Sequence, residues 1–362
     1  MTPITIALIE GDGVGKEVVP EGKKTLDIIS QNTDYDFKFF DISAGGEEWQ
    51  KTGQSITDAS FEKLKTADSI LLGGLGIPGL PQGAAEYAVL RIRQDFNQYV
   101  NLRPIKLYDS LRDICPLKEE YIQSGIEMSI IRENSEGIYR RIGGTVQDRS
   151  SIDTMVFTKT GIERIMHFAF EYAKKNRHTK ITSVDKANLL HTSQMWRSYF
   201  EEEGKKYSKL TKESFYVDAF CQWLIRSPYK FQTVVTSNMF GDIISDEAAY
   251  LVGSLGMGAS GNINPAPKGI SMFEPIHGSA PDIAGKNIAN PIATILSVKL
   301  MFEHVFDDSY IGKLIDTAVE HTVQKKRTPD IFPKINNSKL IQVSTQKMGE
   351  SIRLELEKLL KK

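Results

Sequence analysis

Short apolar segments alternate along the chain with stretches in which apolar residues recur at helical spacing. Four runs of strand length are predicted to be β-strands: Ile4–Ile9, Phe37–Ile42, Ser69–Gly73 and Thr233–Ser237. After Thr158, apolar side chains recur at helical spacing as far as Ala173, which predicts an amphipathic helix. A second helix is expected to begin near Met239, directly after a strand. This alternation is typical of an α/β protein.

Glycine and proline gather in three stretches between these elements: Gly73–Gly83, Gly253–Pro267 and Gly278–Pro291. We expect these stretches to be loops, because both residues interrupt regular structure. In α/β enzymes such loops often lie at one edge of a sheet, where ligands bind. The chain has 362 residues, which exceeds the size at which one core stops growing, so two domains are expected.

Charge and composition exclude several classes of function. The formal net charge is −1, so no overall basic field favours nucleic acid or an anionic membrane. No apolar stretch approaches the roughly 20 residues of a membrane span, and the predicted first strand leaves no room for a signal peptide. Cys115 and Cys221 lie far apart and are expected to be reduced thiols. These features predict a cytoplasmic location and no nucleic-acid or membrane partner.

The segment Gly11–Lys16 follows the first predicted strand and resembles a phosphate-binding loop. Its spacing fits neither common version. The third glycine comes one residue too early for the Rossmann fingerprint, and Glu17 stands where a P-loop needs Ser or Thr. The pattern therefore favours a tight turn between a strand and a helix.

Asp242 and Asp246 are the strongest candidates for chemistry. They are four residues apart in a predicted helix, so both carboxylates project from one face, where like charges repel. A hard divalent cation such as Mg²⁺ or Mn²⁺ would favour that arrangement. The alternative is a solvated acidic face that also includes Glu247. Asp218 is a candidate for a third ligand.

Several other polar residues fit an anionic substrate and a nucleotide. Arg93, Arg103 and Arg132 could bind carboxylates through two parallel hydrogen bonds each, although each alone could be a surface residue. Lys186 follows the strand-like run Lys180–Val184 and could be a base if burial or neighbouring cations lowered its pKa; the alternative is a surface lysine. The backbone amides near Gly278–Ala280 could hold phosphates, and Asp282 could accept hydrogen bonds from a ribose diol.

Taken together, these residues form a pattern that resembles the β-decarboxylating hydroxyacid dehydrogenases, the family of isocitrate and isopropylmalate dehydrogenases. The resemblance covers most of the chain and rests on seven ordered motifs: GDGVGKEVVPEG, NLRPIKLY, IIRENSEGIY, SVDKAN, SNMFGDIISDEAA, MFEPIHGSAPDIAG and GKNIANPIATI. It implies an isopropylmalate dehydrogenase-like two-domain α/β fold with a central mixed sheet, without the Rossmann fingerprint. The larger, dinucleotide-side domain would comprise 1–103 and 259–362, and the smaller domain, with the dimer contacts and the metal site, 104–258.

The resemblance also implies a role for each matching residue. A 2-hydroxy diacid would be oxidised by NAD and would then lose its β-carboxylate as CO₂. Tyr139 would protonate the resulting enol, and Lys186 would remove the hydroxyl proton. Asp218, Asp242 and Asp246 would bind Mg²⁺ or Mn²⁺, with Lys186 and Asp218 supplied by the second subunit of a homodimer. The implied cofactor contacts are Glu86, Asn188, Glu274, His277, Gly278, Ser279, Ala280, Asp282 and Asn290.

The substrate's variable group should face the helix that contains Val89 and Leu90. These apolar side chains resemble those of isopropylmalate enzymes, whereas Arg91 could meet a third carboxylate if it turned inward. Segments such as GIPGLP and INPAPKGISMFEP resemble the tartrate/D-malate branch instead, although AAEYAVL stands where that branch has SLWG. We expect a tartrate/D-malate-like substrate, with 3-isopropylmalate as the alternative. A catalytically silent, regulatory member is a third possibility, against which the complete set of metal and acid–base residues argues.

Overall fold

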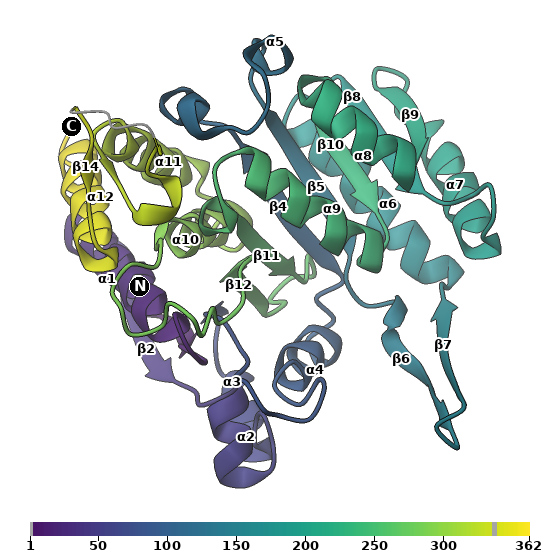
Figure 1. The fold of residues 1–362 in the computed structure, drawn as a ribbon, viewed down its shortest axis with the longest axis horizontal. Coiled ribbons are helices and arrows are strands. Elements are labelled where there is room, and N and C mark those ends of the chain that lie inside the picture. The colour runs from purple at the N-terminus through teal and green to yellow at the C-terminus, as the bar shows by residue number, and fades with distance from the viewer. Residues whose placement is uncertain (1–2, 335–338) are drawn as a thin grey trace. The chain divides into compact units, whose positions relative to one another are not determined.

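The computed structural model describes residues 3–334 and 339–362, which pack into two compact units (Figure 1). Unit 1 comprises Met1–Gln98, Tyr108–Cys115 and Val252–Lys362, and unit 2 comprises Tyr99–Leu107 and Pro116–Leu251. The return of Tyr108–Cys115 to unit 1 was not foreseen from the sequence. Arg327 holds this segment, because its guanidinium donates to the Asp113 carboxylate at 2.9 Å and to the Ser110 carbonyl.

Unit 1 contributes five strands to the central mixed sheet, in the order β2-β1-β3-β12-β11. Its strands are β1 (Ile4–Ile9), β2 (Phe37–Asp41), β3 (Ser69–Leu72), β11 (Ala259–Ile263) and β12 (Ser271–Pro275). All neighbours are parallel except β11 and β12. Two short strands, β13 (Lys326–Arg327) and β14 (Ile341–Gln342), form a separate parallel pair. The first three predicted strands are confirmed to within one residue at either end.

Helices cover both faces of this sheet because its strands are apolar on both sides. Leu71 points to the face where Gly22 of α1 packs, and the next residue, Leu72, belongs to a core cluster with Phe61 and Ile92 on the other face. The helices on the Leu71 side are α1 (Gly15–Asn32) and α10 (Ile292–His304), with α11 (Ser309–Val323) and α12 (Thr345–Leu360) packed against them. The other side carries α2 (Gly46–Thr52), α3 (Asp58–Leu64) and α4 (Tyr87–Asp95).

Unit 2 contributes five strands to the central mixed sheet, in the order β4-β5-β10-β8-β9. Its strands are β4 (Val100–Lys106), β5 (Glu127–Glu133), β8 (Lys180–Asp185), β9 (Thr211–Tyr216) and β10 (Thr233–Thr236). Only the β4–β5 pair is antiparallel. The helices are α5 (Glu119–Ile122), α6 (Lys159–Lys175), α7 (His191–Gly204), α8 (Val217–Arg226) and α9 (Asn238–Leu251). A separate hairpin, β6 (Gly137–Val146) and β7 (Ser150–Val156), extends from this unit (Figure 1).

Local sequence signals explain the two helices that were predicted in this unit. The hydroxyl of Thr158 accepts a hydrogen bond from the Gly161 amide, which caps α6, and Ile162, Ile165 and Ala169 are fully buried along one side of that helix. Helix α9 begins at Asn238, one residue before the predicted start. The central mixed sheet confirms the predicted fold class.

Three other expectations can be compared with the structure. The prediction that Gly253–Pro267 is a loop is wrong, because this stretch contains β11. Within β11, Gly261 packs against the ring of Phe273, so the glycine allows the two strands to pack closely. Cys115 and Cys221 form no disulfide with each other. Within residues 3–334 and 339–362, no helix is long and apolar enough to cross a membrane.

Candidate active site

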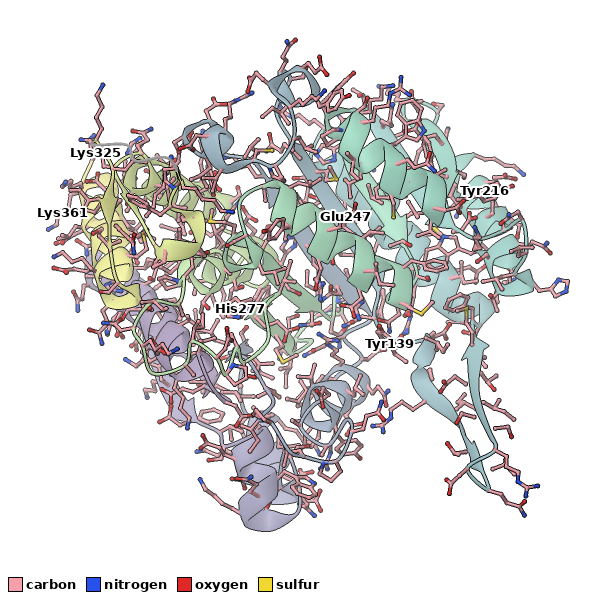
Figure 2. All side chains as sticks on the ribbon, viewed as in Figure 1. Tyr139, Tyr216, Glu247, His277, Lys325 and Lys361 are labelled. Carbon is pink, nitrogen blue, oxygen red and sulfur yellow. The ribbon has the colours of Figure 1, made fainter. Side chains whose placement is uncertain are left out.

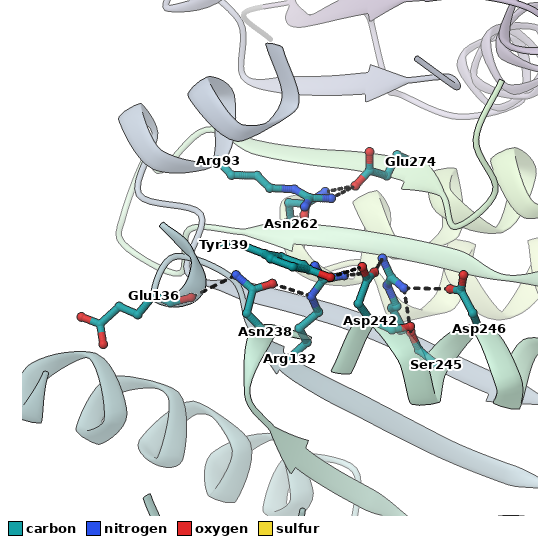
Figure 3. A network of polar contacts seen from close by, with 11 residues as sticks. Arg93, Arg132, Glu136, Tyr139, Asn238, Asp242, Ser245, Asp246, Asn262 and Glu274 are labelled. Atoms are coloured by element: carbon teal, nitrogen blue, oxygen red, sulfur yellow. Dashed lines mark hydrogen bonds and ion pairs between the residues drawn. The ribbon is translucent and has the colours of Figure 1, made fainter. Parts of the chain in front are cut away.

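Asp242 and Asp246 lie on α9 of unit 2, next to two arginines that the adjoining strands supply (Figure 3). Arg103 is opposite Ile130 in the β4–β5 ladder, and Arg132 is two residues further along β5, so both arginines point to one face of the sheet. Arg103 reaches Asp242 at 3.4 Å and Asp246 at 3.2 Å, while Arg132 pairs with Asp242. The structure therefore brings together four of the predicted site residues.

The two carboxylates have the chemistry of a divalent-metal site. Their side chains keep 37% and 51% of their exposure, so their oxygens can be approached. Burial raises the pKa of Asp246, and repulsion from Asp242 adds to this shift, while Arg103 and Arg132 oppose it. Two hard oxygen donors one helical turn apart fit two positions around Mg²⁺ or Mn²⁺. Within the part of the chain that the structure describes, no three His, Cys, Asp or Glu side chains gather closely enough to hold a metal.

Asp218 lies elsewhere in unit 2 and forms an ion pair with Lys186 at 2.5 Å. Lys186 follows β8, and Asp218 is in the first turn of α8. Because Lys186 donates to it, the pKa of Asp218 is lowered. These two predicted residues meet each other but do not join Asp242 and Asp246 within one chain.

Tyr139 lies near the start of β6 (Figure 2), and its hydroxyl points at the carboxylate of Asp242 (Figure 3). The hydroxyl donates to Asp242 Oδ2 at 3.2 Å, and the Arg132 guanidinium lies 5.7 Å from the ring centre. Burial raises the pKa of Tyr139, and the negative charge of Asp242 raises it further. The phenol therefore keeps its proton at neutral pH and can act as an acid.

Arg93 in unit 1 is held by a buried carboxylate (Figure 3). Its Nη2 donates to Glu274 Oε1 at 2.7 Å, and the amide of Asn262 donates to the same oxygen at 2.7 Å. Arg93 Nε is buried and has no hydrogen-bond partner among residues 3–334 and 339–362. The Glu274 side chain thus contacts a predicted substrate residue, a pairing that no sequence motif indicates.

The helix that carries Arg93 also settles the direction of Arg91. Arg91 pairs with Asp58 at 2.8 Å and stacks over the ring of Phe61 at 4.3 Å. It is therefore engaged on a different side of α4 from Arg93. Val89 packs against the core cluster of unit 1, and Leu90 is half-buried.

The glycines of the first turn allow close packing between backbone segments. Gly13 has a φ of +54°, and a Cβ at this position would lie 2.0 Å from the Ser279 carbonyl oxygen, which accepts from the Val14 amide at 2.8 Å. Gly11 approaches Gly74 in the same way. These contacts confirm that the segment is a tight turn whose glycines face protein.

The predicted nucleotide segment presents an open backbone and an exposed carboxylate. Among the residues that the structure describes, none apart from its chain neighbours lies within 4 Å of a Cβ built at Gly278, and Asp282 is exposed, so a ligand could approach both. Burial lowers the pKa of His277, whose ring contacts the Gly278 carbonyl at 2.9 Å. The buried Asn290 donates to Asp330 at 3.0 Å and accepts from the Ile292 amide, so its side chain supports the loop. Glu86 and Asn188 are exposed.

Sequence and structure comparisons agree with this chemistry. The isocitrate/isopropylmalate dehydrogenase family matches residues 5–352. A 3-isopropylmalate dehydrogenase of Aquifex aeolicus is 42% identical, with 99% of each chain covered, and one of Clostridium acetobutylicum is 40% identical over 98% of this chain and 100% of its own. The crystal structure of an isocitrate dehydrogenase from Methylococcus capsulatus has a TM-score of 0.87 at 31% identity, covering 98% of this chain and 99% of that one. The chain therefore belongs to the isocitrate/isopropylmalate dehydrogenase family and is an NAD-dependent decarboxylating hydroxyacid dehydrogenase.

Proposed function

We propose that the enzyme oxidises and decarboxylates 3-isopropylmalate. The observation that carries the reaction type is the grouping of Arg103, Arg132 and Tyr139 around the carboxylates of α9. The substrate is supported by the curated relatives, which bear the name 3-isopropylmalate dehydrogenase. They favour this alternative over the tartrate/D-malate substrate that the loop segments had suggested. The orientation of Arg91 toward Asp58 supports an apolar substituent, because Arg91 is engaged away from the Arg93 side.

Each residue would then have a defined task. Arg93, Arg103 and Arg132 would bind the substrate carboxylates. A Mg²⁺ or Mn²⁺ ion held by Asp242, Asp246 and Asp218 would polarise the substrate oxygens as a Lewis acid. Lys186 would leave its ion pair with Asp218, lose a proton to solvent and then, as a neutral amine, accept the hydroxyl proton. Tyr139 would deliver its proton to the carbon from which CO₂ departs.

The cofactor would be NAD, bound mainly by the loop after β12. The open backbone at Gly278 would admit the phosphates, and the contacts would include His277, Ser279 and Ala280. The exposed carboxylate of Asp282 would accept hydrogen bonds from the ribose diol and repel a 2′-phosphate. Glu86, Glu274, Asn188 and Asn290 are the remaining proposed contacts, with Asn290 acting through its backbone.

We also propose a cytoplasmic homodimer with shared active sites. One face of the β6–β7 hairpin exposes Ile142, Val146 and Ile152. An isolated hairpin is only marginally stable in water, so its apolar face should pack against another protein surface. Ile225 and Ile243, from α8 and α9, are also exposed. A second copy would cover these surfaces and bring its own Lys186 and Asp218. A reducing compartment suits two cysteines that form no disulfide.

Mixing two inactive variants tests the shared site. K186M and D242N would each be inactive alone, but a mixed dimer would contain one complete site if Lys186 and Asp242 come from different subunits. After the two are unfolded and refolded together, about a quarter of the wild-type activity should return, since random pairing gives half mixed dimers with one good site each. No recovery, with mixed dimers demonstrated by mass, would contradict the shared site.

The substrate is tested by NADH formation from a panel of 2-hydroxy acids. The panel contains 3-isopropylmalate, D-malate, the tartrates, isocitrate and homoisocitrate, each with NAD or NADP and with or without Mn²⁺. We expect the highest kcat/KM for 3-isopropylmalate with NAD and Mn²⁺. A clear preference for D-malate or a tartrate would overturn the proposed substrate and leave the reaction type intact.

A further inference from the structure

Asn238 lies at the first turn of α9 and connects two parts of the candidate site (Figure 3). Its side-chain oxygen accepts from Arg132 Nε at 2.9 Å, and its side-chain nitrogen donates to the Glu136 carbonyl at 3.2 Å. The residue is only 3% exposed. Both polar atoms of the Asn238 side chain are therefore bonded to groups outside α9.

The Asn238 amide satisfies both partners at once. Arg132 Nε is a donor and the Glu136 carbonyl is an acceptor, so the side chain must offer one acceptor and one donor in fixed directions. The partner chemistry also fixes which end of the amide faces which group. A carboxylate of the same shape would keep the Arg132 contact but would place an oxygen against the carbonyl of Glu136.

The contact with Nε controls which edge of the Arg132 guanidinium reaches α9. With Nε bonded to Asn238, the Nη1 group meets Asp242. The stem of Arg132 is confined as well, because a Cβ at Gly241 would lie 2.7 Å from Arg132 Cβ. The guanidinium is thus held both at its stem and at its Nε side.

The hydrogen bond from Asn238 to the Glu136 carbonyl restrains the turn that precedes Tyr139. The Glu133 carboxylate accepts from the Ser135 amide at 3.0 Å and from the Glu136 amide at 2.7 Å, which fixes the same turn from its other side. Gly137 then leaves the turn with a φ of +85°. Two residues later the Tyr139 hydroxyl reaches Asp242.

We propose that Asn238 is a positioning residue that sets the orientation of Arg132 and the location of Tyr139 through one amide. It acts through these two residues and does not itself touch the substrate. The inference rests on the proposed function, in which Arg132 binds a substrate carboxylate and Tyr139 donates a proton. Through the Asn238 side chain, substrate recognition by Arg132 and proton donation by Tyr139 would be coupled.

Kinetics of N238A provide the first test. We expect the KM for the hydroxy acid to rise about 10-fold or more, because a hydrogen bond to a charged group is lost. The value of kcat should also fall, whereas the KM for NAD should stay within about 2-fold. N176A is the matched control: Asn176 donates to the Tyr172 carbonyl at 2.9 Å at the end of α6, so its loss should change neither KM. An equal rise in both KM values of N238A would indicate general disruption and overturn the inference.

A double-mutant cycle and a crystal structure complete the test. If Asn238 acts through Arg132, N238A should raise the hydroxy-acid KM less than about 3-fold in an R132K background. If instead the KM of the double mutant rose by the product of the two single-mutant factors, the two residues would act independently and the inference would be refuted. In the isosteric N238D variant, which preserves the shape if N238A does not fold, the turn at Glu136 should move while Arg132 stays. A crystal structure of either variant reads these positions without turnover, so it separates this inference from the proposed activity. Unmoved Arg132 and Tyr139 in N238A, or an unmoved turn in N238D, would overturn it.

Discussion

Replacing Gly13 by alanine should weaken NAD binding, although Gly13 itself is predicted to touch no phosphate. The added Cβ would lie 2.0 Å from the Ser279 carbonyl oxygen, far inside van der Waals contact, so one of the two segments must move. The left-handed φ of +54° costs an alanine about 1 kcal/mol, and loss of the bond between the Val14 amide and Ser279 costs about 1 kcal/mol more. Together these terms amount to about 2 kcal/mol, which corresponds to roughly 30-fold weaker binding if NAD must restore the native loop.

Lys16 provides the matched control for this prediction, because a phosphate-cradling loop would need its ammonium group. In the structure Lys16 is exposed and pairs with Glu47 at 2.5 Å. Titration calorimetry with NAD should therefore give K16A a Kd within about 2-fold of the wild type, since exposed ion pairs contribute little. If K16A lost NAD binding by 10-fold or more while G13A bound normally, the packing explanation would be refuted and a phosphate-binding loop supported.

Three further predictions concern metal, selectivity and pH. D242N should weaken Mn²⁺ binding about 100-fold in calorimetry with an unchanged circular dichroism spectrum, because one anionic ligand is lost; normal binding would remove Asp242 from the site. R91A should leave the kcat/KM for every substrate in the panel within about 3-fold, because Arg91 is engaged with Asp58, and a larger, substrate-specific change would contradict that orientation. Burial lowers the pKa of His178 below its usual 6.5 in the folded protein. As the pH falls, His178 is therefore protonated in the unfolded chain before it is protonated in the folded protein, which favours unfolding. Unfolding temperature should therefore drop from pH 7 to pH 5 and drop less in H178Q; identical slopes would exclude this contribution.

The parts of the fold that the sequence predicts well are those set by local patterns. β1 was predicted with its observed ends, and Thr158 was correctly placed just before α6, because an apolar run and a capping residue act over a few positions. β11 was missed because its stability comes from pairing with β12, which overrides the loop preference of Gly261. Likewise, the attachment of Tyr108–Cys115 to unit 1 depends on Arg327, more than 200 positions away in the sequence.

The candidate site shows the same limit at the level of single side chains. The sequence indicates which residues carry charge, but the partners follow from strand register. Arg103 lies on the face covered by α9 because it stands opposite Ile130 in an antiparallel ladder. A slip of one residue would turn Arg103 to the other face and away from Asp246, while every residue type stayed the same. Arg93 and Glu274 depend in the same way on the placement of α4 beside β12. Residue identity therefore constrains the type of chemistry, and long-range pairing determines which groups can carry it out together.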